Sequence, residues 1–172
     1  MGRPTKADLD RRVGISLRTQ GVRVNRPQLR HLIQRCLEVE NAELGRGIEV
    51  VLCGDRLMRR LNRDYREKDR TTDVLSFPDP EGIPLPEGVA APPLGEVFVS
   101  IPQCRRQALE QNVRAGTELA RLLIHGTLHV LGFDHETEAE RREMKPREQK
   151  LRAWARRHEM GPELLLFGED ET

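Results

Sequence analysis

The sequence predicts an α+β domain with a mixed four-stranded sheet flanked by helices. Short apolar, β-branched runs alternate with segments whose apolar residues recur at helical spacing, an interleaving that also keeps the α/β class open. Hydrophobic residues make up 37% of the chain, and the 14 glycines raise the apolar total to roughly 45%, a value typical of globular proteins. A length of 172 residues without an internal repeat suits one domain over residues 1–172, with a core at about 10–160 and an acidic C-terminal tail.

The first half of the chain contains three predicted strands separated by two predicted helices. The strands are residues 13–17, 47–53 and 72–77. Asn25 is expected to cap the first helix, which carries one apolar face made of Leu29, Leu32, Ile33, Cys36 and Leu37. Asp55 is expected to cap the second helix, with Leu57, Leu61 and Tyr65 on its inner face.

The second half of the chain is predicted to add one strand and three helices. The strand covers residues 95–101, and the proline that follows opens a helix. Residues 118–131 form the most apolar helical segment, so this helix is expected to be central, and Gly132 is expected to end it in the left-handed conformation. A charged helix at about 136–158 precedes the acidic tail.

Charge is balanced overall but unevenly distributed along the chain. The 29 Lys and Arg against 28 Asp and Glu give a net charge of +1, which excludes a uniformly basic nucleic-acid coat. Residues 56–70 nevertheless hold seven bases against three acids, and residues 141–157 hold eight against two. Guanidinium groups in the first stretch could bind a polyanion or could form a solvated helix face. A proline-rich acidic stretch at 78–94 is predicted to be a long loop, and such loops are often functional.

The chain shows features of a cytoplasmic protein. No apolar run approaches the ~18 residues that span a bilayer, and the first residues lack the apolar region of a signal peptide, so no membrane partner is expected. Cys36, Cys53 and Cys104 are odd in number and scattered, as expected for buried, reduced thiols. Aromatic residues are only 3% of the chain, which argues against a stacking platform for single-stranded nucleic acid.

Three histidines in the segment HGTLHVLGFDH (125–135) indicate a metal site. His125 and His129 are four residues apart on a predicted helix and so project from one face, and Gly132 allows the chain to reverse so that His135 can join them. Three neutral nitrogens suit Zn²⁺ and leave its fourth tetrahedral position open. Histidines that pack in the core or cap a helix are the alternative, but a chain with five histidines would match this spacing by chance only about 0.004 times.

The same spacing, H-x₃-H-x₂-G-x₂-H, occurs in the metzincin proteases, but the base of those enzymes is missing here. Gly126 stands where the protease has its catalytic glutamate, so peptide hydrolysis by the usual route is disfavoured. A peptidase or ester hydrolase that recruits Asp134 or Glu96 as its base remains an alternative. Asp134 could also orient a ligand imidazole or the metal's water, or it could cap the next helix.

Three motifs carry a resemblance to a known family. The stretches LNRDYREKDRTTDVLSFP (61–78), LGEVFVS (94–100) and HGTLHVLGFDH (125–135) occur in this order and closely resemble the YbeY family of bacterial rRNA maturation factors. The resemblance implies a zincin-like metal-hydrolase fold, one Zn²⁺ bound by His125, His129 and His135, and Arg66 as the functional arginine beside it. It also implies precursor rRNA or single-stranded RNA as substrate. The implied partners are the small ribosomal subunit, one of its proteins and a ribosome-associated GTPase.

Three residues depart from the common pattern of this family. Thr71 stands in place of a proline, which is expected to soften the loop before the third strand. Phe133 replaces a common tyrosine and so lacks one hydroxyl contact. Glu96 replaces an aspartate, which keeps the carboxylate but lengthens its reach.

The leading hypothesis is a zinc-dependent, single-strand-specific endoribonuclease in small-subunit rRNA maturation and ribosome quality control. Either a water molecule or the 2′-hydroxyl of the substrate would attack phosphorus, while Arg66 steadies the developing charge. The alternative is a non-catalytic, zinc-stabilised ribosome-assembly factor, which a fourth protein ligand on the metal would favour. His31 and His158 are assigned structural roles because each is expected within an amphipathic helix.

Overall fold

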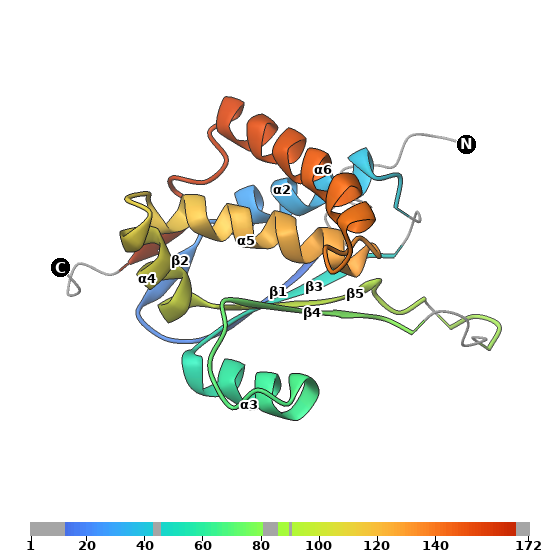
Figure 1. Cartoon of the computed structure of the whole chain (residues 1–172), viewed down its shortest axis with the longest axis horizontal. Helices are drawn as coiled ribbons and strands as arrows, with labels where there is room; N and C mark the ends of the chain where they lie inside the picture. The colour runs from blue at the N-terminus through green and yellow to red at the C-terminus, as the bar shows by residue number, and fades with distance from the viewer. Residues whose placement is uncertain (1–12, 43–45, 81–85, 90, 168–172) are drawn as a thin grey trace.

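A four-stranded mixed sheet separates two unequal layers of helices in the computed structural model, which describes residues 13–42, 46–80, 86–89 and 91–167 (Figure 1). The strand order is β1 (Val13–Arg18), β3 (Ile48–Cys53), β5 (Gly95–Ser100) and β4 (Val74–Pro78). The first three strands are parallel, and β4 is antiparallel to β5. On one face lie α2 (Arg26–Val39), α5 (Ala115–Val130) and α6 (Glu138–Arg157). On the other face lies α3 (Asp55–Arg66), and α4 (Ile101–Glu110) follows directly from the end of β5.

This architecture confirms the predicted α+β class and the predicted sheet. Each predicted strand and helix is present, with ends that shift by one to three residues. The structure adds β2 (Val22–Val24) and β6 (Leu165–Phe167), a short antiparallel pair that the sequence analysis did not predict because three-residue strands carry little periodicity. Parts of the proline-rich stretch and all of the acidic tail lie outside the described residues. The described part of 79–94 contains no helix or strand, as expected for a loop.

Helix α5 is central, as predicted, because its apolar residues point in almost every direction. Leu119, Leu122, Leu123 and Ile124 are all buried, and α5 contacts α2, α6 and the sheet. The helix ends at Val130, and Gly132 follows with φ of 92°, the left-handed conformation that glycine adopts without a side-chain clash. The chain therefore reverses directly after the histidine-bearing turn.

Helix α2 begins and packs as the sequence predicts. The side chain of Asn25 accepts a hydrogen bond of 3.1 Å from the backbone N–H of Gln28, so it caps the helix. All five apolar residues predicted to face the core are buried. In the sheet that α2 covers, β1 and β4 are the two edge strands.

Helix α3 differs from its prediction at both ends. The cap is Gly54, whereas Asp55 is the first helical residue and makes no capping hydrogen bond, so the predicted cap is wrong. The Asp55 carboxylate accepts hydrogen bonds from the hydroxyls of Ser100 (2.6 Å) and Thr71 (3.1 Å). Tyr65 is 66% exposed rather than inward, because α3 buries only its first turns against a small cluster around Cys53, Met58 and Leu75.

All three cysteines are free and buried, as predicted. Burial raises the pKa of Cys36 and Cys104 to about 12 and that of Cys53 to about 11, so the three thiols stay protonated at neutral pH. Among the described residues, no helix is long and apolar enough to cross a membrane.

Candidate metal centre

The three predicted histidines converge on one point at the C-terminal end of α5. His125 and His129 lie one turn apart, and their Nε2 atoms are 3.1 Å from each other. His135, in the loop after α5, has its ring centroid 5.3 Å from that of His125 and 5.0 Å from that of His129. One ring nitrogen from each histidine lies within 4.8 Å of the others. The helix, the glycine turn and the third histidine therefore form the expected zincin-like arrangement.

The geometry fits a tetrahedral cation. Zinc–nitrogen bonds of about 2.0–2.1 Å place two tetrahedral ligand nitrogens about 3.3 Å apart, close to the distance between His125 and His129. Within the described ranges, only these three residues form a group of metal-ligating side chains, so a tetrahedral cation held by them would have a fourth position for a non-protein ligand. His31 and His158 stack on Trp154 instead, at 5.5 and 4.7 Å between ring centroids.

Glu148 of α6 orients the first of these histidines. Its carboxylate oxygen lies 3.0 Å from Nδ1 of His125, on the ring edge opposite the one that faces His129. This hydrogen bond lowers the pKa of Glu148 although partial burial opposes the change. A carboxylate on the outer nitrogen of a ligand histidine fixes the ring and its tautomer, so that Nε2 keeps a free lone pair.

Glu148 was not among the site residues predicted from the sequence. A signal was present, because Glu148 lies between Met144 and Leu151 at helical spacing, on the face of α6 that is buried. An acidic residue on the core-facing side of a basic helix points to a buried partner. The high charge of residues 141–157 concealed this position.

His129 is held neutral by its surroundings. Burial, reinforced by the nearby His125 and His135 rings, lowers the pKa of His129 to about 4, so its imidazole can act as a ligand at neutral pH. Asp134 Oδ1 lies 3.8 Å from Nδ1 of His129 and accepts a hydrogen bond of 2.7 Å from the His135 backbone. Thr137 caps α6, so the interpretation of Asp134 as the helix cap is wrong.

Gly126 explains structurally why no glutamate accompanies the histidines. A Cβ atom at this position would lie 2.7 Å from Cγ1 of Val97 and 3.1 Å from Oγ of Ser76. Ser76 donates a hydrogen bond of 2.9 Å to the Gly126 carbonyl, which ties α5 to β4. The helix thus packs against the sheet where a protease would need room for its base.

The histidines open into a pocket of about 570 Å³ along the β4 edge of the sheet. Arg66, the last residue of α3, lines this pocket together with Lys68 and Arg70, so the structure brings the predicted arginine and the histidines together. Asp134 and Phe133 also line it. Glu96 does not, so the proposed use of Glu96 as a base finds no support.

Arg121 is a second arginine of this pocket that the sequence analysis did not identify. It lies one turn before His125 on α5, and its Nε donates a hydrogen bond of 2.9 Å to Oε2 of Glu118. The Glu118 side chain is only 1% exposed, so Arg121 is its counter-charge. The charged and histidine positions 118, 121, 125 and 129 form one stripe along a mostly apolar helix. That stripe is the sequence signal for this residue.

Comparisons with known proteins connect this site to a family. Residues 15–155 match the sequence profile described as "Endoribonuclease YbeY". Proteins of that name from Azorhizobium caulinodans and Geobacillus thermodenitrificans are 43% and 41% identical over 109 and 127 residues, which cover 63% and 72% of this chain and 67% and 81% of theirs. A Myxococcus xanthus protein of that name is 43% identical over 70% of this chain, but the match spans only 38% of its own length.

A solved structure supports the fold. The solution structure of a Thermotoga maritima protein superposes with a TM-score of 0.56 at 24% identity. The superposition covers 93% of this chain and 99% of that one. The same arrangement of strands and helices therefore occurs in a protein whose sequence is largely different.

Proposed function

Since the chain belongs to the YbeY family, as its motifs predicted, we propose that it is a metal-dependent endoribonuclease that cuts single-stranded RNA in small-subunit rRNA maturation and ribosome quality control. The observation that carries the proposal is the convergence of three histidine nitrogens in a pocket that Arg66 also lines. We also propose that the chain acts as one domain, because one main hydrophobic cluster contains residues from β1 to β6 and a smaller cluster packs α3 against the same sheet.

The histidines would hold the cation, and Glu148 would keep His125 aligned for it. We propose Zn²⁺ because the donor set is three neutral imidazoles with an open fourth position. When bound, such a cation lowers the pKa of a coordinated water and neutralises charge on a phosphoryl oxygen. His125 and His129 contribute through Nε2, since their Nδ1 atoms face Glu148 and Asp134.

Arg66 would bind the scissile phosphate. Its exposed guanidinium has no hydrogen bond or ion pair with any other described residue, so its N–H donors are available to phosphate oxygens. Arg121 is tied to Glu118 and adds positive charge to the wall of the pocket. Asp134 keeps one carboxylate oxygen without a hydrogen bond, and it is the pocket carboxylate best placed to accept a proton from a water molecule or a 2′-hydroxyl.

The family membership also supports a cellular setting. We propose a cytoplasmic protein that works at the small ribosomal subunit with one of its proteins and a ribosome-associated GTPase. The basis of this part is the resemblance of the motifs, together with relatives that are named endoribonucleases.

A non-catalytic role in ribosome assembly is the second candidate, favoured by the missing glutamate. It requires a closed metal site, and no fourth ligand is found within the part of the chain that the structure describes. A peptidase would have to recruit Asp134 as its base, because Gly126 leaves no room for one and Glu96 lies outside the pocket.

The test combines metal analysis with cleavage of precursor small-subunit rRNA and of unstructured RNA and protein. Wild type is expected to bind one metal ion and to cut only RNA. His129→Ala should lose metal and cleavage together, whereas Arg66→Glu should lose cleavage but keep its metal. Arg114→Ala, which removes an exposed arginine that does not line the pocket, is the control and should match wild type. Full cleavage by metal-free His129→Ala protein would refute the proposal.

A further inference from the structure

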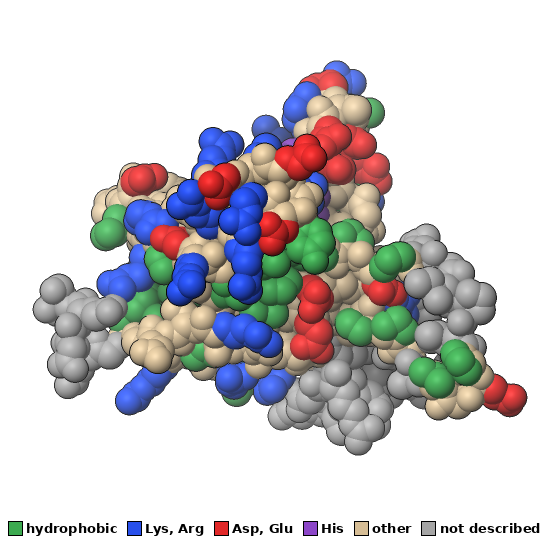
Figure 2. Space-filling model, turned by 90° about the horizontal axis from the view of Figure 1, so that it is seen from below, with side chains coloured by type: hydrophobic (Ala, Val, Ile, Leu, Met, Phe, Trp, Pro, Cys, Tyr) green, Lys and Arg blue, Asp and Glu red, His purple; other side chains and the backbone are tan. Residues whose placement is uncertain are grey.

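A groove lined by arginines runs along α3. Figure 2 shows the face of the molecule that carries α3, where Lys and Arg side chains gather. The groove has a volume of about 1090 Å³ and takes its basic side chains from β1, α3 and the loop that follows α3. These are Arg18, Arg56, Arg59, Arg60, Arg63 and Arg70. Arg63 and Arg70 belong to the motif at residues 61–78, whereas the other four arginines lie outside the three motifs.

Four of these arginines have side chains without a partner among the described residues. Asp69, one of the two acidic residues of the groove, is bound bidentately by Arg59 at 2.8 and 2.9 Å. Arg63 pairs with Asp64 at 2.9 Å. The side chains of the remaining arginines make no hydrogen bond or ion pair within the described residues: Arg18, Arg56, Arg60 and Arg70. The other acidic residue, Asp55, is already bound by Arg106 at 2.8 Å. The groove therefore carries uncompensated positive charge.

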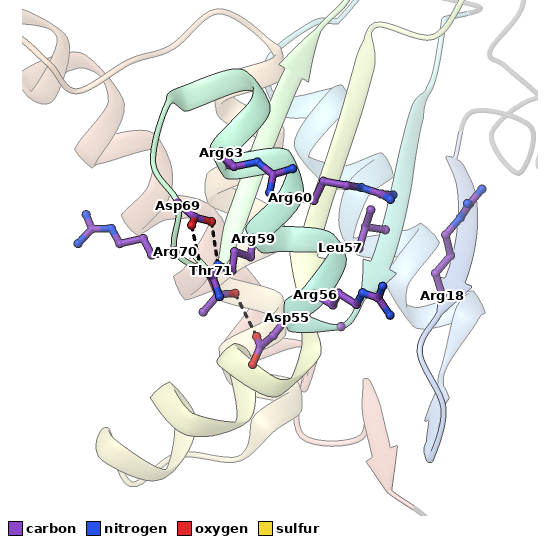
Figure 3. Close-up of a pocket in the computed structure, with 11 residues that line it drawn as sticks. Arg18, Asp55, Arg56, Leu57, Arg59, Arg60, Arg63, Asp69, Arg70 and Thr71 are labelled. Atoms are coloured by element: carbon purple, nitrogen blue, oxygen red, sulfur yellow. Dashed lines mark hydrogen bonds and ion pairs between the residues drawn. The ribbon is translucent and has the colours of Figure 1, made fainter.

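The arrangement of these side chains suits an extended anion. Arg56, Arg60 and Arg63 are at positions i, i+4 and i+7 and thus share one face of α3. Figure 3 shows Arg56 and Arg60 extending from α3 toward β1, from which Arg18 rises, with Leu57 between them. The helical rise separates Arg56 and Arg60 by about 6 Å along the axis. Guanidinium groups in such a row can each bind phosphate oxygens through two parallel N–H donors.

The groove adjoins the metal pocket. Arg70 lines both cavities, and α3 presents Arg66 to the pocket from its C-terminal end. An extended chain that passes Arg70 would therefore contact both cavities. This continuity favours a nucleic-acid strand over an acidic protein segment, which could fit the charge but has no reason to reach the histidines.

We infer that this arginine groove binds the phosphodiester backbone of the RNA strand whose scissile bond lies in the metal pocket. The inference rests on the proposed function, since it takes RNA as the ligand. No aromatic side chain lines the groove, so it does not stack bases and reads the backbone independently of sequence. The groove thus extends the substrate contacts by several nucleotides beyond the phosphate that Arg66 holds.

The test measures equilibrium binding of labelled 2′-O-methyl RNA, verified by gel to stay intact, to the metal-loaded protein. Strands of about 4 and about 12 nucleotides are compared, because the shorter can fill only one of the two cavities. The variant is Arg56→Ala/Arg60→Ala. The control is Arg114→Ala/Arg157→Ala, which removes the same charge from exposed positions outside both cavities.

The groove variant is expected to bind the long strand about tenfold more weakly, with little change for the short strand. Its salt dependence should fall by about 1.4 in the slope of log K against log salt, since each lost phosphate contact on a single strand contributes about 0.7. The control should keep the wild-type slope. An equal loss in the groove variant and the control would overturn the inference, because only net charge would then matter.

Two further outcomes separate this inference from the proposed function. If wild type binds the long strand through the groove but cuts no RNA, the proposed function is wrong and the inference that the groove binds RNA is supported. If wild type cuts RNA but the groove variant binds both strands normally, only the groove inference fails. Loss of poly-glutamate binding without loss of RNA binding in the variant would identify an acidic-protein site and would also overturn it.

Discussion

Helices α5 and α3 lie on opposite faces of one sheet, but they hold their functional side chains in different ways. On α5, His125 and His129 stand on a buried helix, and Glu148 and the close contact at Gly126 fix their positions. On α3, Arg56 and Arg60 are exposed and have no partner among the described residues. Metal ligands must be placed to within about 0.5 Å, which requires a packed scaffold. A polyanion needs only positive charge within reach, so mobile arginines suffice.

This difference predicts that changes around α5 act on stability and metal affinity, whereas changes on the outer face of α3 act on ligand binding alone.

The largest effect is expected at Gly126. Gly126→Ala should destabilise the protein by about 1–3 kcal/mol, because the new Cβ would overlap the stiff, fully buried Val97 at 2.7 Å. Gly126→Glu should cost more than about 3 kcal/mol, since it also buries a charge. Urea unfolding measures both.

Gly54→Ala, at the start of α3, is the matched control. No atom lies within 4 Å of a Cβ built there, and its φ of −91° suits any residue. Its cost should stay within about 1 kcal/mol, as expected when an N-cap glycine is replaced by alanine. Equal costs at the two glycines would show that α5 is not packed more tightly than α3.

Arg121→Ala should cause the next largest loss in the free energy of unfolding. It would leave the Glu118 carboxylate, which is 1% exposed, without its counter-charge, and such a loss costs about 3 kcal/mol. The double variant Arg121→Ala/Glu118→Gln should recover part of this loss, because the buried charge is then removed. Arg60→Ala on α3 should change the free energy of unfolding by less than about 0.5 kcal/mol. A similar loss from Arg60→Ala in urea unfolding would contradict the proposed division.

Glu148→Gln tests the metal centre without removing a ligand. The amide cannot stabilise the His125 ring as a carboxylate does, so metal affinity should fall by about 10- to 100-fold. Competition with a chelator of known affinity measures the change. Glu143→Gln, on the exposed face of the same helix, should leave the affinity unchanged. An unaltered affinity in Glu148→Gln would show that the hydrogen bond does not tune the site.

The same residue marks the limit of what could be predicted from the sequence. The strands, the helices and the three histidines were predictable because each depends on local spacing. Glu148 and Arg121 were not identified, because their roles depend on how α6 and α5 pack and which of their faces meet. Asp55 was misassigned for a related reason: its partners Ser100 and Arg106 are 45 and 51 residues away in the chain. From the sequence alone, capping the adjacent helix was therefore the role predicted for its carboxylate.

The smallest effect is expected at Asp55. Its carboxylate is fixed by hydrogen bonds to other elements, as the functional side chains of α5 are. Burial alone would raise its pKa, but hydrogen bonds from Ser100, Arg106 and Thr71 outweigh burial and lower it. A carboxylate whose pKa is lower in the folded state adds stability above its unfolded pKa of about 3.9 and loses it as the pH falls through the folded value. Asp55→Asn should therefore be less stable than wild type at neutral pH, and the gap should close below about pH 4. Urea unfolding midpoints measured from pH 2 to 7 test this, and a gap that stays constant with pH would show that the ionised carboxylate adds nothing at this end of α3.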